Sequence, residues 1–180
     1  LAVFVMNRAT TAVCAGQFEF ALSLYWEVLR AQRVLARGVF KVQGDVIRAR
    51  CADALACYGK LDMAQALLDI QKTHTPETLG GIQLLARSVI TLRRGQFNDA
   101  LQELQTHWTA AESVYTATEL KALIIVRAFA LHNCESIADY TTDARVNSLS
   151  LDDVVRNRWL GTHWSDMRSF VETLERQFSA

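Results

Sequence analysis

Apolar residues recur along this chain at intervals of three and four, the spacing that places them on one face of an α-helix. The pattern breaks at glycines and at Pro76, which cannot continue a helix. The most apolar run lies within residues 118–133. Helices are predicted over residues 2–14, 19–37, 45–58, 62–72, 79–94, 98–108, 118–133, 151–159 and 162–178. The pattern therefore predicts an all-α fold.

A short motif separates the helices of three predicted pairs. It consists of a glycine, an apolar residue two positions later and an alanine five positions later, and its copies begin at Gly16, Gly59 and Gly95. Glycine adopts the left-handed conformation that closes a helix at little steric cost, so each glycine is predicted to end one helix. A small residue also stands seven positions before each glycine. These small residues and the alanines of the motif are Ala9, Ala52, Ser88, Ala21, Ala64 and Ala100. Small side chains let helices approach closely, so the motif predicts three crossing points.

A fourth copy of the motif is degenerate. Asn133 takes the place of the glycine, and asparagine is the next-best residue for the left-handed conformation. Ala138 follows five positions later, but Glu135 replaces the apolar residue.

After Asp143 the register of the repeat is lost. Ser150 and the acidic residues after it then predict the start of a short helix that runs to Trp159. A last helix over residues 162–178 follows, and we expect these helices to cap the stack.

Charge and cysteine content narrow the classes of function. The 180 residues hold 19 basic and 19 acidic side chains, a balance that argues against nucleic-acid binding. The apolar runs are far shorter than the roughly 20 residues of a membrane helix, so no membrane role is expected. The four cysteines are scattered and form no Cys-x-x-Cys motif, which favours small buried side chains in a reducing compartment. We expect a cytoplasmic protein without metal or cofactor.

The copies of the motif resemble the tetratricopeptide repeat. The three glycines lie 43 and 36 residues apart, and each follows and precedes a predicted helix. The resemblance covers residues 2–108 in three copies and reaches about residue 145 with the fourth. The first spacing exceeds the family's repeat of about 34 residues, and no copy has the family's early Trp. Pro76 matches the family's closing proline in the second copy alone.

This resemblance implies a right-handed superhelical array of antiparallel helix pairs, an α-solenoid. We expect one domain over residues 1–180, with three to four repeats in 2–145 and capping helices in 150–179. Because the chain begins with Leu1, we also expect it to be a fragment of a longer chain. An irregular helical bundle with coincidental copies of the motif is the alternative.

The resemblance also implies a concave groove lined by the first helix of each pair. The positions expected to face this groove are Met6, Asn7, Thr10, Ala49, Arg50, Asp53, Ile82, Leu85, Val89 and Arg127. The family's clamp for a C-terminal carboxylate is absent, because only Arg50 offers a suitable side chain. A mostly apolar groove with isolated arginines suits a peptide or helix with apolar anchors and acidic character. The alternative is that the chain's own connection or its C-terminal helix packs this groove.

Two further features each have a structural and a functional interpretation. Residues 27–50 hold six basic and two acidic side chains, which fits a solvated helix face or a site for an acidic partner. Trp159 and Trp164 fit buried anchors of the cap or an exposed binding hot spot. We favour the structural interpretation of both.

The histidines offer no catalytic pattern. They stand at predicted turns and helix ends, without the spacing of a metal site or of a serine–histidine–aspartate triad, and no glycine-rich phosphate loop is present. We therefore predict no enzyme, no catalytic residue and no metal ligand. The predicted function is a protein-interaction scaffold or the partner-sensing module of a larger regulator, binding another protein, a peptide or a second copy of the chain. The alternative is a ligand-responsive regulatory domain that binds a small hydrophobic molecule.

Overall fold

The computed structural model describes residues 2–35, 40–70, 76–134 and 140–179, and this part of the chain is all-helical with no strand. The α-helices are α1 (Ala2–Cys14), α2 (Phe18–Leu35), α3 (Phe40–Tyr58), α4 (Leu61–Asp69), α5 (Pro76–Ile82), α6 (Leu84–Arg93), α7 (Phe97–Glu112), α8 (Ala117–Asn133), α9 (Leu151–Arg156) and α10 (Ser165–Phe178). Short 3-10 turns lie at Tyr140–Thr142, Val146–Ser148 and Arg158–Gly161. Among the described helices, none combines the length and the apolar character needed to cross a membrane.

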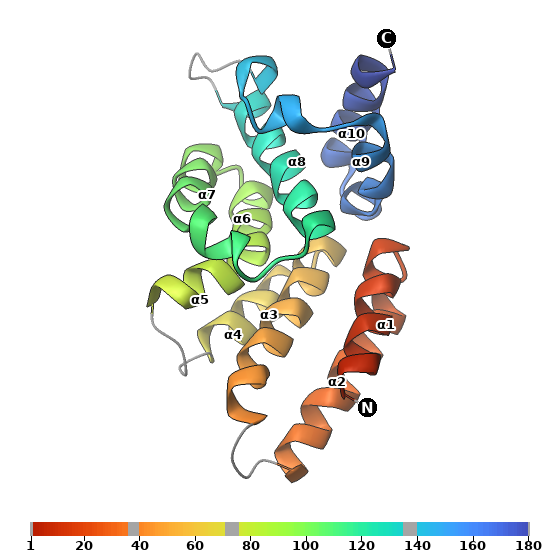
Figure 1. The fold of residues 1–180 in the computed structure, drawn as a ribbon, viewed down its shortest axis with the longest axis vertical. Helices are drawn as coiled ribbons and strands as arrows, with labels where there is room; N and C mark the ends of the chain where they lie inside the picture. Colours follow the sequence, from red (N-terminus) through yellow and green to blue (C-terminus); the bar gives the residue numbers. More distant parts are fainter. Residues whose placement is uncertain (1, 36–39, 71–75, 135–139, 180) are drawn as a thin grey trace.

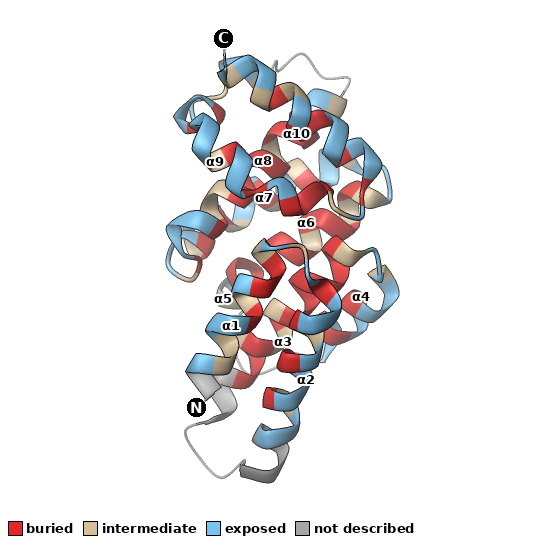
Figure 2. Cartoon of the chain, turned by 90° about the vertical axis from the view of Figure 1, so that its right-hand side faces the viewer, coloured by how far each residue is buried: buried red, intermediate tan, exposed pale blue. Residues whose placement is uncertain are grey.

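Several helices that follow each other in the sequence lie side by side, among them α1 and α2, α2 and α3, and α7 and α8 (Figure 1). The pairs α1–α2, α3–α4 and α6–α7 each fold back on themselves, and α3 packs against both α2 and α6. Buried residues concentrate in α3, α6 and α8, whereas α1, α2 and α4 each turn an exposed face outwards (Figure 2). The all-α prediction is confirmed, and the right-handed solenoid arrangement stays a prediction.

The three motif glycines form the same turn. Their φ angles are 72° at Gly16, 92° at Gly59 and 76° at Gly95. In each turn the glycine amide donates to the carbonyl three residues earlier, and the next amide donates to the carbonyl five residues before it. This is the Schellman arrangement, which satisfies carbonyl groups left free at a helix end. The predicted left-handed glycine is confirmed at all three turns.

The small residues at the predicted crossing points are buried. All six small residues have fully buried side chains, with an exposed fraction of 0%. These residues are Ala9, Ala21, Ala52, Ala64, Ser88 and Ala100. This burial agrees with the close approach of the helices that the repeated spacing predicts, and the location of the crossings stays a prediction.

The predicted helix over residues 79–94 is wrong in one respect, because the structure divides it at Gln83 into α5 and α6. Pro76 begins α5, a position where its missing amide hydrogen breaks no hydrogen bond. Gly81 lets α5 pack against α7, since a Cβ added there would lie 2.7 Å from the carbonyl carbon of Ala110. Helix α3 begins at Phe40, earlier than predicted, and Gly44 lies within it.

The fourth copy of the motif does not form a turn of the same kind. Asn133 is the last residue of α8, and its side-chain amide donates to the carbonyl oxygen of Phe129 at 2.8 Å. The chain leaves the helix through Cys134, whose φ of −81° and ψ of 126° are extended rather than left-handed. Glu135 and Ala138 lie outside the described residues. Residues 140–148 contain two short 3-10 turns where the second helix of a fourth pair would lie.

The C-terminal segment packs on α8 through aromatic rings. Phe129 of α8 lies 5.0 Å from Trp164 and 5.5 Å from Phe170 of α10, measured between ring centroids. Trp159 and Trp164 are both buried, which confirms their interpretation as core anchors. Ser150 caps α9 as predicted, since its hydroxyl accepts from the amide of Asp153.

The connection before α10 also reaches back to the repeated turns. Arg93 at the end of α6 donates to the carbonyl oxygens of Cys57 and His163, at 2.8 and 2.9 Å. Its guanidinium carbon lies 4.7 Å from the ring of Trp164. Arg93 thus links the C-terminal end of α3 to the segment that precedes α10.

Candidate functional site

The predicted groove positions divide into a buried and an accessible set. Five of them, on α3, α5 and α6, have exposed fractions of 5% or less and pack inside the protein. These are Ala49, Asp53, Ile82, Leu85 and Val89. Among the others, Asn7 is exposed, and Met6, Thr10, Arg50 and Arg127 are partly buried. The accessible positions on α1 therefore do not continue into an open groove over α3 and α6.

A segment of the chain itself packs against Ile82, Leu85 and Arg50. The connection from α7 to α8 passes beside α3 and brings Tyr115 against the break between α5 and α6 (Figure 1). The Tyr115 hydroxyl donates to the carbonyl oxygen of Ile82 at 2.9 Å and accepts from the amide of Leu85 at 3.3 Å. The ring of Tyr115 lies 4.2 Å from the guanidinium carbon of Arg50. These contacts match the alternative in which the chain's own connection packs the groove.

Arg50 also holds the start of α8 by an ion pair. Its Nη1 lies 2.9 Å from Oε1 of Glu119, and its Nη2 donates to Oε2 of the same carboxylate at 3.1 Å. Glu119 in turn accepts from the amide and the hydroxyl of Thr116, which forms the capping box of α8. One guanidinium therefore connects α3 to the first turn of α8 across 69 residues of sequence.

Asp53 is the second carboxylate beside Arg50. Its Oδ2 lies 3.5 Å from Nη1 of Arg50, and its Oδ1 accepts no hydrogen bond from the described part of the chain. Burial raises the pKa of Asp53 to about 7; Arg50 opposes this rise, and the negative charge of Glu119 adds to it. The amide of Ala86 on α6 also lowers the pKa of Asp53. Asp53 can therefore gain or lose a proton near neutral pH.

Sequence reasoning missed Tyr115 and Glu119 as parts of this region. The Thr-x-x-Glu spacing at Thr116 is the signal of a helix start and could have marked Glu119. Nothing in the sequence indicates that this carboxylate would pair with Arg50.

Arg127, the last of the predicted positions, has a partner elsewhere. Its Nη2 lies 2.8 Å from Oδ2 of Asp143, and burial of this pair leaves both side chains less than one-fifth exposed. Hydrogen bonds and the charge of Arg127 hold the pKa of Asp143 below its ordinary value against the effect of its burial. The ion pair holds the segment after α8 against that helix. It shares no residue with the ion pair between Arg50 and Glu119.

Large apolar side chains are exposed on the outer side of the first helices. Phe4 on α1 is 69% exposed, and Phe20 and Trp26 on α2 are 41% and 37% exposed. The guanidinium carbon of Arg8 lies 5.1 Å from the centroid of the Phe20 ring. Trp26 and Arg30 are four residues apart and lie on the same exposed side of α2, whereas Phe20, six residues before Trp26, is exposed towards Arg8 of α1. We call Phe4, Arg8, Phe20, Trp26 and Arg30 the aromatic outer face.

The other features noted in the sequence have structural partners. His132 packs against Phe170, and His163 against Tyr58, at centroid distances of 5.1 and 4.7 Å. His74 and the side chains of residues 32–43, which include three of the six basic residues of the 27–50 segment, lie outside the described residues. In the described part of the chain, no group of three histidine, cysteine or acidic side chains is placed to hold a metal.

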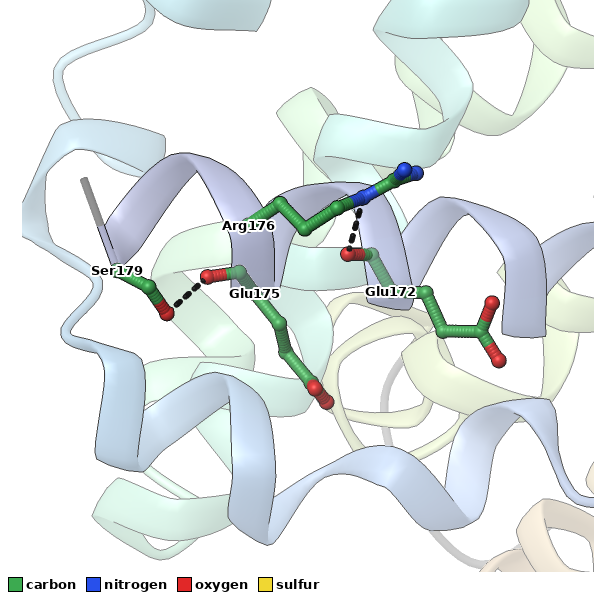
Figure 3. Close-up of a pocket in the computed structure, with 4 residues that line it drawn as sticks. All are labelled: Glu172, Glu175, Arg176 and Ser179. Carbon is green, nitrogen blue, oxygen red and sulfur yellow. Dashed lines mark hydrogen bonds between the residues drawn. The ribbon is translucent and has the colours of Figure 1, made fainter.

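One hollow of the surface lies on α10. It has a volume of about 620 Å³ and is lined by Glu172, Glu175, Arg176 and Ser179 (Figure 3). The hydrogen bonds drawn there join Arg176 and Ser179 to carbonyl oxygens of α10 itself. Charged side chains line this hollow, so it lends no support to binding of a small hydrophobic molecule.

Comparison of the chain with protein-family models, with curated proteins and with solved structures finds no match. The resemblance to the tetratricopeptide repeat therefore stays a prediction that rests on the motif.

Proposed function

We propose that this chain is a protein-interaction module and that it binds its partner through the aromatic outer face. The observation that carries the proposal is the exposure of Phe4, Phe20 and Trp26 on neighbouring helices of a protein whose other aromatic clusters are packed. Exposed apolar surface that is grouped rather than scattered marks interaction sites in soluble proteins. Aromatic and arginine side chains supply most of the binding energy at such sites.

The burial pattern favours this face over the predicted groove. A partner that used the positions on α3 and α6 would have to displace Tyr115 and break the Arg50–Glu119 pair. The aromatic outer face requires no such rearrangement, because its side chains already reach the surface. Association is strongest where the binding surface is already formed.

The chemistry of the face indicates the kind of partner. Arg8 lies over the ring of Phe20, and Arg30 is exposed one helical turn after Trp26, so the face includes two cationic hydrogen-bond donors. A protein segment with apolar anchors and nearby carboxylates would bury the rings and pair with the guanidinium groups. This is the partner that the sequence also predicts, placed on a different surface.

A double variant in which glutamate replaces both Phe20 and Trp26 should lose partner binding. The substitution adds charge where rings would be buried, and loss of two hot-spot side chains weakens binding by about 30-fold or more each. Immobilised wild-type and variant proteins would be compared for the proteins that they retain from an extract of expressing cells, with quantification by mass spectrometry.

The matched control replaces Gln102 and Gln105, two exposed residues of α7, with glutamate. This variant should retain the same proteins as the wild type, and circular dichroism should show equal helix content in all three. Equal retention by the Phe20/Trp26 variant and the wild type would exclude the aromatic outer face as the binding surface.

A further inference from the structure

We propose that Asp53 is a proton-operated switch that sets how firmly the Tyr115–Glu119 segment is held on α3. When Asp53 is neutral the segment stays closed over the groove positions, and when Asp53 is ionised the segment opens more often. The proposal concerns a conformational equilibrium of the chain itself and does not depend on which surface binds a partner.

The geometry supplies an imbalance of charge. Arg50 faces two carboxylates, Glu119 at 2.9 Å and Asp53 at 3.5 Å, and the three side chains are almost fully buried. The shorter contact belongs to Glu119, so the guanidinium does not compensate Asp53 fully. Burying an ionised carboxylate without sufficient hydrogen bonds is unfavourable, and Oδ1 of Asp53 has no donor in the described part of the chain.

No other group near Asp53 takes up its charge. On α3 the thiols of Cys51 and Cys57 have pKa values raised by burial and by the charge of Asp53. Tyr25 on α2 and Tyr115 beside α8 have pKa values that burial also raises, so both phenols stay neutral. From α6, the amide of Ala86 contributes a hydrogen bond but no charge. Arg50 and Glu119 complete the charged and titratable groups that interact with Asp53.

Opening lowers the electrostatic cost of burying Asp53 only when Asp53 is charged. Lifting Tyr115 and Glu119 from α3 would admit water to Oδ1 and remove the second negative charge from its vicinity. A neutral Asp53 gains little from either change, because an uncharged carboxyl group is buried at much lower cost.

The direction of the pH effect follows from linkage. The pKa of Asp53 is raised to about 7 in the closed state and returns towards its ordinary value of 3.8 when the cluster opens. The closed state therefore binds the proton more tightly. The free-energy advantage of the closed state over the open state is largest below about pH 4. It decreases progressively as the pH rises towards 7 and does not change further above pH 7. The opening constant should rise by up to about tenfold per pH unit within this window.

Amide hydrogen exchange measures this opening directly. The Leu85 amide donates to the Tyr115 hydroxyl and the Glu119 amide to the Thr116 hydroxyl, so both report on the segment. Their opening constants, after division by the intrinsic exchange rate at each pH, should rise at least tenfold between pH 5 and pH 7.5 in the wild type. In Asp53→Asn the rise should fall below threefold. Asp62→Asn, at an exposed position of α4, should behave as the wild type.

Equal pH dependence in the wild type and Asp53→Asn would overturn the proposal. If Asp53→Asn does not fold, the carboxyl carbon of Asp53 in the wild-type protein gives the answer by nuclear magnetic resonance. A midpoint near pH 7 supports the switch, and a midpoint near the ordinary value of about 4 overturns it.

Discussion

Replacing Arg50 with methionine should lower the free energy of unfolding by about 3–5 kcal/mol, the largest effect that we expect from a single substitution. Methionine has a similar length and is uncharged, so it leaves Glu119 and Asp53 buried without a cation. It also removes the guanidinium from the ring of Tyr115. Breaking a buried ion pair on one side is far more harmful than removing an exposed charge, because the remaining charge stays desolvated.

Urea unfolding followed by circular dichroism measures this loss, with Arg30→Met as the matched control. Arg30 is exposed on α2, so its replacement should change the free energy of unfolding by less than about 0.5 kcal/mol. In an Asp53→Asn background the loss caused by Arg50→Met should shrink, since one of the two carboxylates is already neutral. A loss of less than about 1 kcal/mol for Arg50→Met would show that the cluster does not hold α8 against α3.

Replacing Phe129 with alanine should lower the free energy of unfolding by about 3–5 kcal/mol. Phe129 is buried on α8 and contacts Phe97 of α7 as well as Trp164 and Phe170 of the C-terminal segment. Its ring thus joins three parts of the fold. Alanine would leave a cavity that these neighbouring rings cannot fill without moving, and such a cavity adds to the lost burial of the ring.

Phe4→Ala is the matched control for this substitution, because the same atoms are removed from a ring that is mostly exposed. It should change the free energy of unfolding by less than about 0.5 kcal/mol. Near-ultraviolet circular dichroism of Phe129→Ala should also show a weaker signal from Trp164, which packs beside the cavity. Similar stability losses for the two variants would contradict the role of Phe129 in attaching the C-terminal segment.

The local features of the fold were predictable because they depend on residues close in sequence. A glycine with small residues seven positions before and five positions after it specifies both a left-handed turn and a close crossing. The structure has the left-handed turn at Gly16, Gly59 and Gly95, and the small residues before and after each glycine are buried. Asn133 shows the limit of the pattern. An asparagine can adopt the left-handed backbone conformation, but it can also stay within the helix and cap it through its side-chain amide.

Features that depend on distant contacts were not predictable. Helical periodicity places Ala49, Asp53 and Val89 on the face of a first helix, but it does not say what packs on that face. The covering residue Tyr115 and the partner of Arg50, Glu119, come from a connection that follows no repeat. For the same reason nothing in the sequence indicates that Phe20, inside the repeated motif, remains exposed.

Site-specific photo-crosslinking tests the central claim most directly. A photoreactive phenylalanine analogue would be placed at position 20 on the aromatic outer face, or at position 102 on α7, in the protein expressed in cells. The account predicts that position 20 yields a covalent adduct with a specific partner protein and that position 102 does not. An adduct formed equally from both positions, or from position 102 alone, would contradict the account.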